Sequence, residues 1–153
     1  MAMIAVSGYA QTVSYIHKPW KEDGCTVTFS VSAQDTAYYI VVSVAPGDFK
    51  FLSSPTMKLK TTSGEVIKLK GVSLGDETAT SYRKDGDEVI ASKLTTMAMF
   101  AATPEQFEKM KGGVAKVRLS TIPFAHERTF DVDKIGKALY DLYVKERDAE
   151  ENF

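Results

Sequence analysis

Four lysines on the arms of a predicted hairpin are the residues whose spacing best suits a binding function. Residues 57–70 alternate apolar and polar side chains about Gly64, as two antiparallel arms do. If Leu59 lies opposite Leu69, the alternation along each arm puts all the lysines on the other, solvent-facing side. They are Lys58, Lys60, Lys68 and Lys70, with Lys60 expected opposite Lys68 and Lys58 opposite Lys70. Four clustered ammonium groups suit a polyanion, an acidic glycan or an anionic lipid headgroup.

A plain solvated surface explains the same lysines, since lysine also protects sheet edges against unwanted strand pairing. Residues 57–120 carry net positive charge and residues 121–153 net negative charge, so the two parts of the chain can also attract each other.

Trp20 is the aromatic residue with the clearest binding potential. It lies in a predicted polar loop, with Tyr15 five residues before it. An exposed tryptophan beside Tyr15 can stack on a sugar ring or anchor a protein partner. The alternative is a tryptophan lid over one end of the sheet.

Two histidines, His17 and His126, are the side chains whose ordinary pKa suits general base chemistry near neutral pH. If the fold brought them together, with Glu127 orienting His126, they would suit a small hydrolase or phosphodiesterase. The alternative is that both lie exposed in loops at strand ends and do no chemistry.

The remaining chemistry-bearing residues predict neither a cofactor nor a metal site. The chain has one cysteine and two histidines, too few for a site rich in either ligand, and it has no phosphate-binding or nucleophile-elbow motif. The net charge of −1 and the sequence pI of about 6.1 argue against nucleic acid as the partner.

The elements that must position these residues predict the α+β class. The chain has 153 residues, one domain's worth, and no apolar run approaches the ~20 residues of a membrane span. Strand patterns cover residues 13–17, 25–32, 37–45, 49–52, 57–70, 88–101 and 114–120, while residues 71–81 look like a surface loop. Helix signals cover residues 103–113, where Thr103 and Gln106 can form a capping box, and residues 131–147, where Asp133 is the expected cap.

We therefore expect an antiparallel β-sheet or sandwich, with a short capped helix and a C-terminal helix packed on it. Residues 11–147 would form a single domain and residues 148–153 an acidic, frayed tail. Within the C-terminal helix, Ile135, Leu139, Leu142 and Tyr143 follow helical spacing and should face the sheet.

Residues 1–10, MAMIAVSGYA, are uncharged and end in small residues at Gly8 and Ala10. This is typical of the end of a secretory signal peptide, with the mature protein beginning near Gln11 and a lysine-containing start upstream. The alternative is an N-terminal strand.

The stretches TPEQFEKMKGGVAKVRLSTIP and DVDKIGKALYDLY resemble small β-rich proteins of unknown function from Bacteroides and relatives, which are usually secreted or lipid-anchored. The resemblance rests on caps and core positions, among them Thr103, Phe107 and Ile135, and implies a fold style and an extracytoplasmic location, with no catalytic residue to carry over. The sequence thus predicts a periplasmic or secreted, non-catalytic binding or assembly module for an anion or glycan. The alternatives are the hydrolase that uses both histidines, a protein partner, and a cytoplasmic location.

Overall fold

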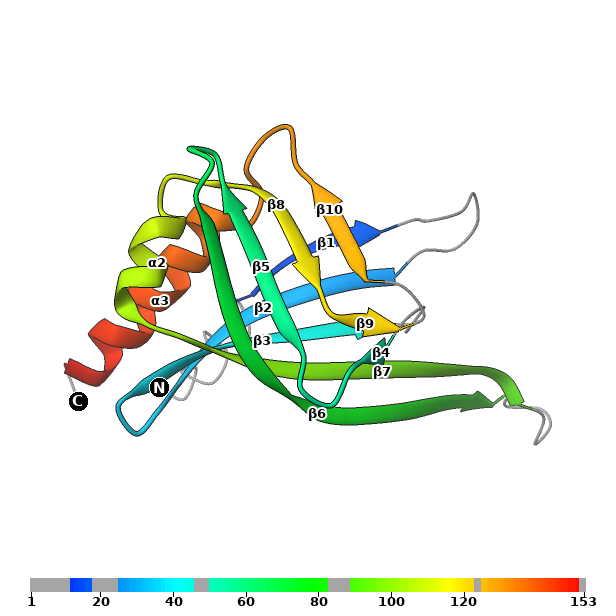
Figure 1. Cartoon of the computed structure of the whole chain (residues 1–153). Coiled ribbons are helices and arrows are strands. Elements are labelled where there is room, and N and C mark those ends of the chain that lie inside the picture. The colour runs from blue at the N-terminus through cyan, green and yellow to red at the C-terminus, as the bar shows by residue number, and fades with distance from the viewer. Residues whose placement is uncertain (1–11, 18–24, 46–49, 83–88, 123–124, 152–153) are drawn as a thin grey trace.

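The computed structural model of the chain describes residues 12–17, 25–45, 50–82, 89–122 and 125–151. In these residues eight strands form one sheet in the order β1-β2-β3-β7-β6-β5-β8-β10, and β4 and β9 form a second, two-stranded sheet. All neighbouring strands are antiparallel. The large sheet curls into a half-barrel, and α2 and α3 pack together at one end of it (Figure 1). The predicted α+β class is confirmed, and most of its strands belong to one large antiparallel sheet.

The strands are β1 (Val13–His17), β2 (Cys25–Gln34), β3 (Ala37–Ala45), β4 (Lys50–Phe51), β5 (Thr56–Thr61), β6 (Val66–Tyr82), β7 (Val89–Ala102), β8 (Val114–Leu119), β9 (Thr121–Ile122) and β10 (His126–Thr129). The helices are α2 (Pro104–Met110) and α3 (Gly136–Glu151).

The hydrophobic core fills the concave side of the sheet, because alternate residues of each strand point there. On β2 and β3 the inward residues are Val27, Phe29, Val31, Ile40, Val42 and Val44, all at most 8% exposed. On β5 and β8 the inward residues are Met57, Leu59, Val117 and Leu119, each 0% exposed. The outer face of β5 and β8 is thereby left to polar side chains.

Side chains join the two edge strands of the sheet, β1 and β10. The hydroxyl of Tyr15 lies 2.7 Å from Nε2 of His126, and the two rings stack. Arg128 donates a hydrogen bond of 2.7 Å to the backbone carbonyl of Ile16, and its guanidinium lies over the Tyr15 ring. These contacts hold the edges of the half-barrel together.

The short helix α2 has the predicted ends. The Thr103 hydroxyl accepts a hydrogen bond from the Gln106 backbone N–H, and the Gln106 side chain accepts one from the Thr103 N–H, which completes a capping box. The chain leaves the helix through Gly113, whose φ of 111° suits a residue without a Cβ.

The C-terminal helix is shifted along the chain from its predicted bounds. It begins at Gly136 rather than residue 131, because the Asp133 carboxylate accepts hydrogen bonds from the N–H groups of Gly136 and Lys137 and so caps a later start. It ends at Glu151, so most of the expected frayed tail is helical. Partial burial of Asp133 opposes its charge, but hydrogen bonds from four backbone N–H groups outweigh burial and hold its pKa below the ordinary value.

The prediction of a surface loop at residues 71–81 is wrong. Strand β6 continues through this stretch and pairs with β7 from Gly71 to Tyr82. The first part of β6 pairs instead with β5, so one strand connects both halves of the curled sheet. Polar residues are compatible with this strand because its hydrogen bonds come from the backbone of β7.

Candidate anion-binding face

The β5–β6 hairpin has a register two residues away from the predicted one. Lys58 lies opposite Lys68, whereas Lys60 lies opposite Val66 and Lys70 opposite Thr56, so the predicted lysine pairs are wrong. Gly64 has a φ of 97° and donates its N–H to the Thr61 carbonyl at 2.9 Å. The glycine therefore ends the turn, where a left-handed residue is needed, rather than standing at its centre.

The predicted lysine surface is nevertheless present, because a slip of two residues keeps every side chain on its own face. Lys58, Lys60, Lys68 and Lys70 are all exposed on the outer side of the sheet. Leu59 and Leu69, at 0% and 1% exposed, lie on the inner side as expected.

Strand β8 adds two further cations to this surface. It pairs with the other edge of β5, where Arg118 lies opposite Lys58 and Lys116 opposite Lys60. We call these six residues the cationic face: Lys58, Lys60, Lys68, Lys70, Lys116 and Arg118. The two members from β8 are not among the site residues predicted from the sequence. Lys116 and Arg118 alternate with the buried Val117 and Leu119, and this pattern predicts that the two basic side chains face outward. No local sequence pattern predicts that β8 pairs with β5.

The centre of the cationic face is a row of three like charges. Lys58 has Lys68 across one ladder and Arg118 across the other. Directly opposed side chains in such ladders have Cβ atoms roughly 4.5–5.5 Å apart, and like charges there destabilise the sheet. An anionic ligand lying across the row would relieve this repulsion.

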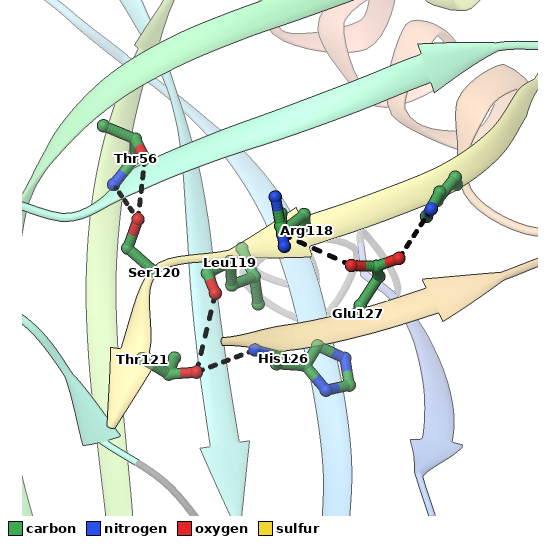
Figure 2. Close-up of polar contacts among 8 residues, drawn as sticks. Thr56, Arg118, Leu119, Ser120, Thr121, His126 and Glu127 are labelled. Carbon is green, nitrogen blue, oxygen red and sulfur yellow. Dashed lines mark hydrogen bonds and ion pairs between the residues drawn. The ribbon is translucent and has the colours of Figure 1, made fainter. Parts of the chain in front are cut away.

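Glu127 on β10 is the acid that borders the cationic face. Its carboxylate contacts Lys116 Nζ at 2.6 Å and Arg118 Nε at 3.3 Å. Figure 2 shows the carboxylate turned towards Arg118. The hydrogen bond from Lys116, helped by the charges of both basic residues, lowers the pKa of Glu127 from its ordinary value. Glu127 therefore carries its negative charge at neutral pH and offsets part of the positive potential.

Two shallow depressions adjoin on this surface. One has a volume of about 150 Å³ and is lined by Lys58, Lys60, Val66, Lys116, Arg118 and Glu127. The other has a volume of about 190 Å³ and is lined by Thr56, Lys58, Arg118, Leu119, Ser120 and Ala125. In the second, the hydroxyls of Thr56 and Ser120 are hydrogen-bonded at 2.7 Å (Figure 2). Because Lys58 and Arg118 line both, they are the cations best placed to hold a sulfate or phosphate group.

The other predicted site residues lie away from this surface or outside the described residues. Tyr15 is 5% exposed and its hydroxyl is hydrogen-bonded to His126, so its ring does not offer an exposed face to a ligand. Trp20 lies outside the described residues. The backbone of His17 pairs with Cys25 at the end of β1, and its side chain is outside the description.

His126 does not occupy an exposed loop. It lies in β10 with 4% of its surface exposed, and its backbone N–H donates to the Thr121 hydroxyl at 2.9 Å (Figure 2). Its imidazole belongs to the side-chain contacts that connect β10 with β1.

Comparison with protein-family models, with curated proteins and with solved structures finds no match for this chain. Over the part of the chain that the structure describes, no helix is both long and apolar enough to cross a membrane.

If the cationic face binds a sulfated oligosaccharide, replacing Glu127 with glutamine should tighten that binding about two- to fivefold at low ionic strength. The change removes a carboxylate that would compete with such an anion for Lys116 and Arg118. Isothermal titration of the two proteins measures the effect. Asp141→Asn, which removes an exposed acid from α3, is the control and should leave the affinity unchanged. Equal affinities for the wild type and Glu127→Gln would contradict this role of Glu127.

Proposed function

We propose that the chain is a non-catalytic binding module whose cationic face holds a polyanion that carries closely spaced sulfate, phosphate or carboxylate groups. The observation that carries the proposal is the row Lys68–Lys58–Arg118, in which sheet register aligns three like charges on neighbouring strands. The two depressions that share Lys58 and Arg118 support it, because they give anionic groups a place beside these cations.

The non-catalytic assignment is supported by the position of His126. A general base must reach the proton that it removes, and this imidazole is buried and engaged with Tyr15.

We further propose that the module works in the periplasm or as a secreted protein. The uncharged residues 1–10, with Gly8 and Ala10 near their end, support this location. N-terminal sequencing of protein purified from its native host should then begin at or near Gln11, whereas retention of Met1 would contradict it.

The double variant Lys58→Gln/Lys68→Gln tests the binding function. It should weaken binding to a sulfated oligosaccharide about five- to tenfold at low salt, and the difference should shrink as salt screens the charges. Because the substitutions remove a like-charge pair, the melting temperature should stay the same or rise slightly. Isothermal titration and thermal melting measure the two effects.

The matched control is Lys134→Gln/Lys137→Gln, which removes two exposed lysines. Lys134 lies just before α3, and Lys137 lies in its first turn. Both double variants lose the same net charge, so the proposal requires that the control retain near wild-type affinity. Equal losses from the two variants, or binding that is indifferent to salt, would reduce the cationic face to an ordinary solvated surface.

A further inference from the structure

Exposed aliphatic side chains flank the lysines along the outer side of β6. Val66, Lys68, Lys70 and Val72 alternate outward along it and are exposed, and Leu74 is exposed at the bulge between Ser73 and Gly75, where the pairing with β7 shifts. The three aliphatic members are 60%, 51% and 49% exposed. The regular part of this row, from Val66 to Val72, covers about 20 Å along the strand, since a strand rises about 3.3 Å per residue. One strand thus presents two cations between apolar residues.

The apolar end of this row continues on the neighbouring strands. Val72 lies opposite Met99 of β7, which in turn lies opposite Val41 of β3, and both neighbours are only partly buried. Three outward apolar side chains therefore adjoin across three strands.

The chain between β4 and β5 adds another exposed aliphatic residue here. Ser73 donates its backbone N–H to the Ser53 carbonyl at 3.3 Å, which brings the segment that carries Leu52 alongside β6. Leu52 is 41% exposed. We call Leu52, Val72 and Leu74 the apolar margin. It lies where β6 bends from β5 towards β7 (Figure 1).

The bend brings the apolar margin next to the cationic face. Gly71 sits at this point, where a Cβ would meet the Met99 carbonyl and lie 2.6 Å from the Phe100 ring. With no side chain at this position, β6 approaches β7 closely directly after Lys70. Lys70 and Val72 are two residues apart and both face outward.

The pairing of the two surfaces discriminates between anionic ligands. A soluble polyanion gains from the lysines but has no apolar phase to receive Val72 and Leu74. A bilayer that contains anionic lipid offers both, because its phosphates attract cations while the headgroup–acyl boundary accepts aliphatic side chains. Because the lysines are positively charged, they favour a bilayer that contains anionic lipid over a neutral one.

We propose that the cationic face and the apolar margin together dock the protein on the surface of an anionic lipid bilayer. Lys68 and Lys70 contact lipid phosphates, and Val72 and Leu74 enter the headgroup–acyl boundary. The inference rests on the proposed function, because the same lysines provide the charge, and it specifies that the polyanion is a membrane surface.

Co-flotation with lipid vesicles tests the proposal on the full chain. The wild type should float with vesicles of 70% phosphatidylcholine and 30% phosphatidylglycerol and not with pure phosphatidylcholine. Val72→Thr/Leu74→Thr keeps or adds β-branching and should reduce the bound fraction about fivefold or more, with unchanged affinity for a sulfated oligosaccharide. Lys68→Gln/Lys70→Gln should weaken both interactions. Val132→Thr changes a valine that is 73% exposed and lies outside β6, and it should weaken neither.

A second variant reports on insertion directly. Leu74→Trp should bind the anionic vesicles more tightly, and its additional fluorescence should shift to shorter wavelength on binding, because an indole ring favours the membrane interface.

The outcomes separate this inference from the proposed function. If the wild type binds the oligosaccharide but not the anionic vesicles, or if Val72→Thr/Leu74→Thr binds vesicles as the wild type does, membrane docking is overturned while polyanion binding stands. If the wild type binds neither, both proposals fail.

Discussion

Replacing Leu139 with alanine should lower the free energy of unfolding by about 2–5 kcal/mol, the range for buried leucines whose removal leaves a cavity. Leu139 is 0% exposed and belongs to the main hydrophobic core. It lies on α3, which packs against β2 and α2. The substitution thus removes apolar contacts between the helix and the half-barrel, and chemical denaturation measures the loss.

Lys137→Ala is the matched control, because it truncates a long side chain two positions away on the exposed side of the same helix. It should change the free energy of unfolding by about 0.5 kcal/mol or less. Similar losses from both variants would mean that α3 does not pack through the face that carries Leu139.

Gly136→Ala should destabilise the protein by about 1–3 kcal/mol, the usual cost of forcing extra volume into a packed site. A Cβ at Gly136 would lie 2.6 Å from the backbone nitrogen of Val114 and 2.8 Å from the carbonyl oxygen of Met110. These are backbone atoms, so a side-chain rotation cannot relieve the clash. Helix propensity alone predicts the opposite sign, since alanine is better than glycine in a helix by about 1 kcal/mol.

Gly112→Ala provides the comparison for this second prediction. A Cβ at Gly112 would meet no heavy atom within 4 Å, so the substitution should be neutral or slightly stabilising. Thermal melting of both variants decides between the two effects. If Gly136→Ala melts at or above the wild-type temperature, α3 does not approach the end of α2 as closely as described.

Alternating residues were sufficient to predict which side of the hairpin each lysine occupies, but not the residues opposite them. The side of the sheet on which a lysine lies changes only when the pairing shifts by an odd number of residues. The burial of Leu59 and Leu69 excludes such a shift. The register depends on turn geometry, and there the positive φ of Gly64 decides. A loop centred on Gly64 places each side chain on the correct face of the hairpin. The residues that it pairs across the two strands are nevertheless shifted by two positions from the observed pairs.

Pairings between distant segments were beyond prediction for a different reason. Strand β8 lies beside β5, and His126 of β10 contacts Tyr15 of β1, 111 residues earlier. No local pattern encodes either contact, because each joins segments that lie far apart in the sequence. The second half of β6 was mistaken for a loop because its residues are mostly polar, whereas its partner β7 supplies the backbone hydrogen bonds.

Helix ends were predicted where side chains bond to nearby backbone. Thr103 and Gln106 cap α2 over three residues, so the sequence contains the whole motif. Asp133 was also identified as a cap, but its carboxylate additionally accepts the N–H of Val114, 19 residues earlier. Such a tertiary contact is not visible in the sequence, and the start of α3 was accordingly misplaced.

Amide chemical shifts report where on the protein an anion binds. The ¹⁵N-labelled full chain is titrated with a sulfated oligosaccharide of defined length at low and at moderate salt. We expect the largest shift changes within residues 56–60, 66–70 and 116–120, and we expect them to diminish as salt is added. Largest changes in α3 or in β2, or no change at low salt, would contradict it.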